Sequence, residues 1–111
     1  MTIDELIGYN IERTAEWRRR RAEHSPDDDR NARAAEFLGR CAEEIASLEG
    51  SAIHRRLEVL ATDVDEFNLN VSFVLRSVGF AFQPTSCDEL LDKIAEQASL
   101  RAELPKPFRV R

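Results

Sequence analysis

Apolar residues recur every three or four positions along most of this chain, the spacing that gathers side chains on one face of a helix. The first such stretch opens with a capping box, Thr2 with Glu5, and predicts a helix from about Ile3 to Glu23. Polar residues interrupt its inward stripe, which favours a polar position that fixes helix register. A small polar pocket between helices is the competing interpretation. The stripe reads Ile3, Ile7, Asn10, Thr14, Trp17 and Arg21.

A second helix is predicted directly after the first. Ser25 is its expected cap, Pro26 suits the first helical position, and the acidic triplet 27–29 complements the positive end of the helix dipole. The apolar stripe then continues to Leu48, before Gly50. Two long helices joined by a very short connection predict an antiparallel helical hairpin.

The third stretch has the most regular pattern. After Ser51 as cap, its apolar positions keep the spacing without a miss and predict one long helix over residues 52–78. They are Ile53, Leu57, Leu60, Val64, Phe67, Val71, Val74 and Val78. A competing pattern of period two indicates strands at 69–75 and 78–82, and so an α+β fold with a short hairpin at about 69–82. The helix is favoured because the link Arg76-Ser77 lacks the Gly or Asn of a tight hairpin turn.

A fourth helix is predicted from another capping box, Ser86 with Glu89, through about Ala102. Two prolines then exclude helix and leave residues 105–111 as an extended basic tail. The predicted fold is therefore all-α: an antiparallel up-down bundle of three long helices plus one shorter C-terminal helix, within a single domain of residues 1–104.

Composition and charge narrow the class of protein. The chain has 111 residues, 42% of them apolar, and a net charge of -5, which predicts one globular domain without a membrane span. An acidic surface disfavours nucleic acid, and the run Arg18–Arg21 is expected to be solvated, with Glu16 pairing to Arg20. The N-terminus lacks the pattern of a signal peptide, so a cytoplasmic location is expected.

Candidate chemistry is sparse, and a non-enzymatic protein without metal or cofactor is expected. The two histidines, His24 and His54, have no zinc-type spacing. Cys41 and Cys87 are expected to be reduced thiols, the first in the core. Cys87 opens a helix whose dipole favours a thiolate, but no histidine near it in sequence provides a base, so its reactivity stays open.

The main functional signal is that residues 69–78 would be apolar nearly all round a helix. Such a helix needs cover on several sides, which predicts a homo-oligomer, preferably a dimer, or a protein partner docked on the 67–82 stretch. Asn68 and Asn70 would then select the geometry. The predicted interface consists of Phe67, Leu69, Val71, Phe73, Val74, Leu75, Val78, Phe80 and Phe82. The alternative is a small-ligand or metal site inside the bundle, built from Asn10, Thr14, Trp17 and His54.

Overall fold

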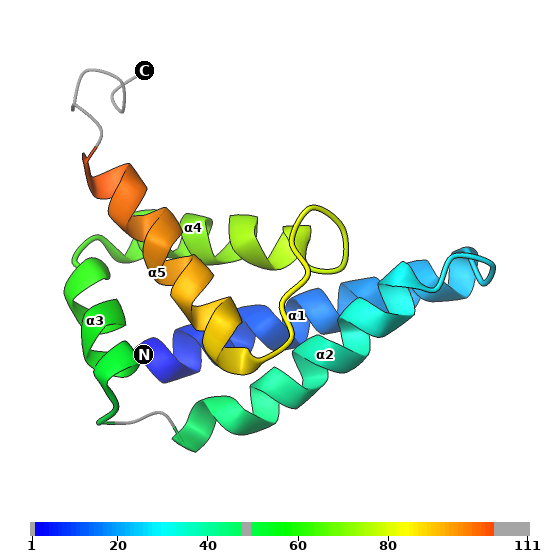
Figure 1. Cartoon of the computed structure of the whole chain (residues 1–111), viewed down its shortest axis with the longest axis horizontal. Helices are drawn as coiled ribbons and strands as arrows, with labels where there is room; N and C mark the ends of the chain where they lie inside the picture. Colours follow the sequence, from blue (N-terminus) through cyan, green and yellow to red (C-terminus); the bar gives the residue numbers. More distant parts are fainter. Residues whose placement is uncertain (1, 48–49, 104–111) are drawn as a thin grey trace.

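The computed structural model describes residues 2–47 and 50–103, and within them the chain is helical and contains no strand (Figure 1). The all-α prediction is confirmed. The helices are α1 (Ile3–His24), α2 (Arg30–Glu44), the 3-10 turn η1 (Ile45–Ser47), α3 (Ala52–Leu60), α4 (Val64–Ser77) and α5 (Cys87–Glu103).

Helices α1 and α2 form the predicted antiparallel hairpin, and α1 begins as predicted, with the Thr2 side chain accepting a hydrogen bond from the Glu5 amide. The predicted start of α2 at Ser25 is wrong. The Ser25 amide instead donates to carbonyls of the last turn of α1, so this residue ends the first helix. The Asp28 carboxylate binds both the amide and the guanidinium of Arg30, which lowers the pKa of Asp28 to about 2. Helix α2 therefore starts at Arg30.

The other end of α2 also differs from the prediction. The α-helix stops at Glu44 and continues as the 3-10 turn, while Leu48, where the predicted helix ended, lies outside the described residues.

The single long helix predicted over 52–78 is wrong, because residues 61–63 break it into α3 and α4. The Asp63 side chain accepts a hydrogen bond from the Glu66 amide at 3.1 Å and so caps a new helix. The apolar pattern runs through the break because Leu57 in α3 and Phe67 in α4 both enter the same core. The alternative hairpin at 69–82 is wrong as well: residues 69–77 are helical, and one isolated bridge joins Val78 and Phe82.

A tight loop between α4 and α5 packs on α2. Gly79 has a φ of +86°, and a Cβ at this position would lie 3.0 Å from the Ala34 Cβ, so the close approach requires glycine. The Ser86 side chain then accepts a hydrogen bond from the Glu89 amide, which confirms the predicted start of α5. Helix α5 has 17 residues against 14 in α4, so the prediction of a shorter last helix is wrong. The predicted tail, residues 105–111, lies outside the described residues.

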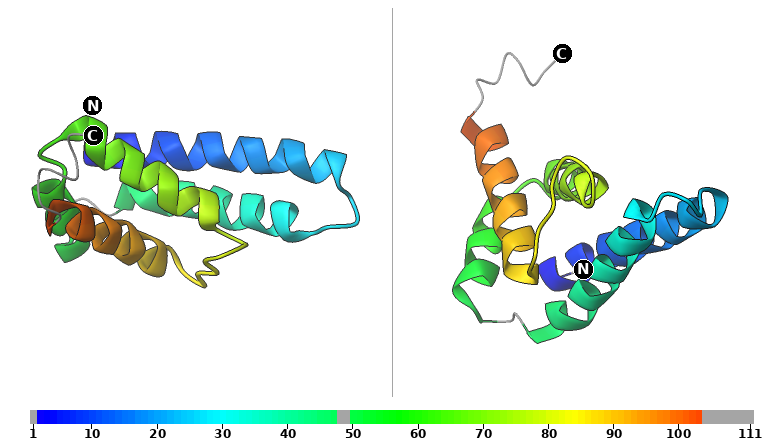
Figure 2. Two further views of the ribbon diagram at one scale, coloured as in Figure 1. Left: turned by 90° about the horizontal axis from the view of Figure 1, so that it is seen from above. Right: turned by 45° about the vertical axis from the view of Figure 1, so that its right-hand side comes forward.

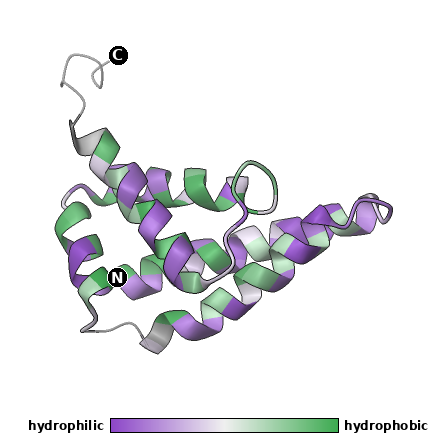
Figure 3. Ribbon diagram, in the orientation of Figure 1, coloured by the Kyte–Doolittle hydropathy of each residue, from purple (hydrophilic) through white to green (hydrophobic). Residues whose placement is uncertain are grey.

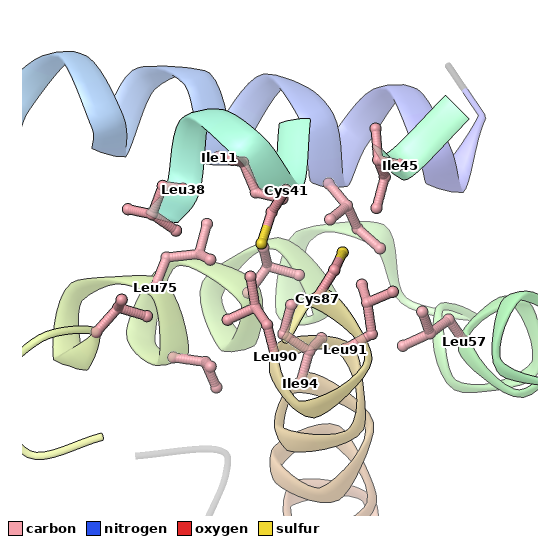
Figure 4. Close-up of a cluster of buried hydrophobic side chains, with 14 of the residues drawn as sticks. Ile11, Leu38, Cys41, Ile45, Leu57, Leu75, Cys87, Leu90, Leu91 and Ile94 are labelled. Atoms are coloured by element: carbon pink, nitrogen blue, oxygen red, sulfur yellow. The ribbon is translucent and has the colours of Figure 1, made fainter. Parts of the chain in front are cut away.

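The elements are arranged around one half of the hairpin (Figures 1 and 2). Helix α4 lies beside α1, and α5 crosses α4 obliquely. Helix α3 lies at the end of the body where α1 begins and contacts both α1 and α5. Figure 3 shows that the far end of the hairpin, with its turn, is hydrophilic. The core lies where α4 and α5 cover α1 and α2, and contains Ile11, Leu38, Leu75, Leu90 and Ile94 (Figure 4).

Candidate functional site

The structure divides the predicted interface into two parts. Five of its residues are buried and belong to the core: Phe67, Val71, Val74, Leu75 and Val78. Phe80 and Phe82 are half-buried in the loop after α4. Two are largely exposed, Leu69 at 69% and Phe73 at 64% of their surface. The surplus of apolar residues in this stretch is therefore mostly internal, and what remains outside lies on a single face of α4.

Helices α1 and α4 run side by side in the same direction, and hydrogen bonds fix their register. The Asn10 side chain donates to the Asn68 side chain at 2.8 Å. Two turns further on, the Arg18 guanidinium donates to the backbone carbonyl of Arg76. Both pairs have the same separation in sequence, so the two helices keep one register over this length. Asn68, predicted to select the geometry of a contact between molecules, instead bonds within the chain to Asn10, and Asn70 is buried.

A groove of about 910 Å³ lies between these two helices. The structure places three residues of the predicted ligand site, Asn10, Thr14 and Trp17, in its wall. Opposite them are Asn68, Ser72 and Arg76 of α4. The Thr14 hydroxyl donates to the Asn10 carbonyl at 2.8 Å, which satisfies that hydroxyl within the helix.

The fourth predicted ligand residue, His54, is not in this groove. It lies on α3, where Nδ1 is 2.8 Å from Asp4 and Nε2 is 3.1 Å from Glu58. The contact with Asp4 ties α3 to the start of α1, whereas Glu58 lies on α3 itself, so His54 joins two helices at the other end of the body. Within the described residues no group of three or more metal-ligating side chains is found.

The exposed surface of α4 has an ordered pattern of charge. Leu69 and Phe73 lie one helical turn apart, and neither lines the groove although each follows a residue of its wall in the sequence. Exposed Asp65 lies one turn before Leu69, and exposed Arg76 lies about one turn after Phe73. We define the outer face of α4 as Asp65, Leu69, Ser72, Phe73 and Arg76. Its order along the helix is acidic, apolar, polar, apolar, basic.

The structure also places Arg18 differently from the sequence prediction. It was expected on a solvated surface, yet only 5% of it is exposed. Its guanidinium carbon lies 4.7 Å from the centre of the Trp17 ring and 4.5 Å from that of Phe80. It also donates to the Asn31 side chain at 2.9 Å. Burial, and then the charge of Arg21, lowers the pKa of Arg18.

The other three arginines of the run are exposed, as expected, and Arg20 pairs with Glu16 at 3.3 Å. A stripe drawn through Ile7, Ile11, Ala15 and then Arg18 would have identified the buried arginine, since those three neighbours are all buried. The predicted stripe through Asn10, Thr14 and Trp17 is rotated from that line towards the groove, so it follows the groove wall instead.

Comparisons with protein-family models, with curated proteins and with solved structures find no match for this chain. In the described part of the chain, no helix has the length and apolar character needed to cross a membrane.

Proposed function

We propose that this protein is a non-enzymatic self-association module in which the outer face of α4 pairs with the same face of a second copy. The observation that carries the proposal is the pair Leu69 and Phe73, two large apolar side chains exposed one turn apart on a well-formed helix. Fully burying a side chain of this kind contributes about 1.5–3 kcal/mol. Each copy would supply two of them.

The order of residues on this face favours a second copy over an unrelated partner. A two-fold axis between Leu69 and Phe73 sets the two α4 helices antiparallel, with Leu69 of one copy against Phe73 of the other. The same axis places Asp65 of each copy near Arg76 of the other. The face is thus complementary to itself in both apolar contact and charge. Exposed Tyr9 and Trp17 on α1 can extend the contact beyond α4.

Light scattering on a size-exclusion column tests the proposal. We expect the native chain, of 12.7 kDa, to approach twice that mass as its concentration rises. The variant Phe73→Asp should stay monomeric at every concentration and remain folded, because Phe73 is exposed and a charge there meets water.

The matched control is Val59→Asp, because Val59 is an apolar residue that is 73% exposed on a different helix, α3. It should dimerise like the native chain. A native chain that stays monomeric, or a Phe73→Asp variant that dimerises as well as the control, would contradict the proposal.

A second candidate function is supported by the groove between α1 and α4, which unites three of the four residues predicted to bind a small ligand. A ligand at 100 times its dissociation constant would stabilise the protein by about 2.7 kcal/mol, a measurable thermal shift. If the variant Asn68→Ala lost that thermal shift, the ligand-binding site would be assigned to the groove.

We also propose a cytoplasmic location. Both cysteines are unpaired, and reducing compartments keep thiols unpaired. Cell fractionation would test it.

A further inference from the structure

Fold geometry brings together the two cysteines of the chain, Cys41 in the middle of the sequence and Cys87 towards its end. Cys41 lies on the buried face of α2, and Cys87 is the first residue of α5. Both are free and buried. Figure 4 shows the two sulfur atoms directed into the same space between these helices. The two thiols are close enough for each to shift the pKa of the other.

Regular structure holds each thiol in place. Cys41 packs in the same core as Leu38 and Ile45, on the apolar stripe of α2. Cys87 follows Ser86, whose side chain caps α5 by accepting a hydrogen bond from the Glu89 amide at 3.2 Å. The Glu89 carboxylate in turn accepts from the Thr85 hydroxyl at 2.6 Å. The pair is therefore part of the fold, with both helix positions fixed by their own hydrogen bonds and packing.

A small cavity leads to the pair. Its volume is about 350 Å³, and both cysteines line it together with Arg40, Glu44, Thr85 and Asp88. The remaining lining residues are Phe37 and Ser86, so five of the six neighbours of the cysteines are polar or charged, and Arg40, Thr85 and Asp88 are exposed. A small polar oxidant can enter a space of this size and polarity, whereas a protein cannot.

The interaction between the two thiols makes them unequal. The neighbouring Cys87 lowers the pKa of Cys41, while burial opposes that effect. The neighbouring Cys41, together with burial, raises the pKa of Cys87. These directions favour Cys41 as the first of the two to form a thiolate. The sequence alone leaves the reactivity of Cys87 open and places Cys41 in the core.

We propose that Cys41 and Cys87 form a dithiol site that hydrogen peroxide oxidises to an intramolecular disulfide. The Cys41 thiolate attacks one peroxide oxygen, the O–O bond breaks, and the departing hydroxide takes a proton to become water. Cys41 is then a sulfenic acid. The Cys87 sulfur attacks the Cys41 sulfur, the S–S bond forms as the S–O bond breaks, and the second oxygen leaves as water with the Cys87 proton. Two thiols lose two electrons, and one peroxide gains them.

The disulfide would join α2 to α5 and enclose η1, α3 and α4 in one covalent loop. Constraining the unfolded chain in this way raises resistance to unfolding. For a domain of this size, we expect the oxidised protein to melt roughly 10 °C higher than the reduced one.

The experiment exposes the full reduced chain to hydrogen peroxide and follows thiols, mass and melting temperature. We expect both thiols to disappear together, the monomer to lose two hydrogens in mass, and the higher melting temperature to revert with a reductant. Retention of both thiols, linkage only between chains, or a lower melting temperature after oxidation would overturn the proposal.

Two variants test the roles. In Cys87→Ala, Cys41 lacks its resolving partner, so a reagent that traps sulfenic acids should label it. In Cys41→Ala, Cys87 should stay a thiol under the same exposure. Labelling of Cys87 in place of Cys41 would overturn the assigned order. Because the native chain already gives the disulfide readout, poor folding of either variant leaves the main test intact.

Discussion

The inner and outer faces of α4 have similar side chains in opposite surroundings. Phe67 and Val71 on the inner face are essentially inaccessible to solvent, whereas Leu69 and Phe73 on the outer face are mostly exposed. The inner face packs into the core formed with α1, α2 and α5. The outer face ends in charge at both sides, Asp65 and Arg76. One short helix thus supplies two separate apolar surfaces, one for a contact within the chain and one for the contact proposed between chains.

The difference between the faces lies in position around the helix. Residues three and four apart lie on one side of a helix, so Phe67, Val71 and Val74 line up inward. Leu69 and Phe73 share that spacing with each other but are rotated out of the stripe. The sequence prediction of a single interface over 67–82 joined these two sets because it took a helix apolar nearly all round to need cover on several sides.

The largest expected effect is a difference in stability between variants of the inner face and variants of the outer face. Phe67→Ala should lower the free energy of unfolding by about 3–5 kcal/mol, because it leaves a cavity in the core. Phe73→Ala should change it by less than about 0.5 kcal/mol at low concentration, where the chain is a monomer. Denaturant unfolding measures both. Equal losses of unfolding free energy in the two variants would contradict the assignment of Phe67 to the core and Phe73 to the surface.

A smaller loss of stability is expected on substitution of Arg18. Its guanidinium donates to the backbone carbonyl of Arg76 and so holds the last turn of α4. Arg18→Lys keeps the charge but loses the planar group between Trp17 and Phe80 and the second hydrogen bond to Asn31. We expect a loss of about 1–3 kcal/mol in unfolding free energy.

The matched control for this change is Arg19→Lys on the exposed side of α1, which should be near neutral. If both variants were equally stable, Arg18 would not fix the end of α4, and the presentation of the outer face would depend on other contacts.

Much of the fold follows from local signals in the sequence, and the exceptions have physical causes. Capping boxes at Thr2 and Ser86 gave correct helix starts because a side chain and an amide three residues apart suffice to cap a helix. The break before α4 was missed although Asp63 and Glu66 offer the same signal. The unbroken apolar stripe outweighed it, since two helices in one core keep a common pattern.

The candidate site was harder to predict, because it depends on which helices become neighbours. Asn10, Thr14 and Trp17 were recognised as a polar set, but their partners on α4 come from a register that no local pattern encodes. His54 was assigned to the wrong group for the same reason. Nor does sequence spacing reveal that Cys41 and Cys87 meet, since they belong to separate helices that α3 and α4 divide.

The most direct test of the central claim uses charge on the outer face. Asp65→Arg and Arg76→Asp each place like charges opposite one another in the antiparallel pair, so each variant alone should be monomeric. An equimolar mixture of the two restores an acidic residue opposite a basic one at both ends. Light scattering should therefore show a dimer in the mixture and monomers in each separate sample, with helix content unchanged. A mixture that stays monomeric while the native chain dimerises, or single variants that dimerise as the native chain does, would contradict the proposed pairing.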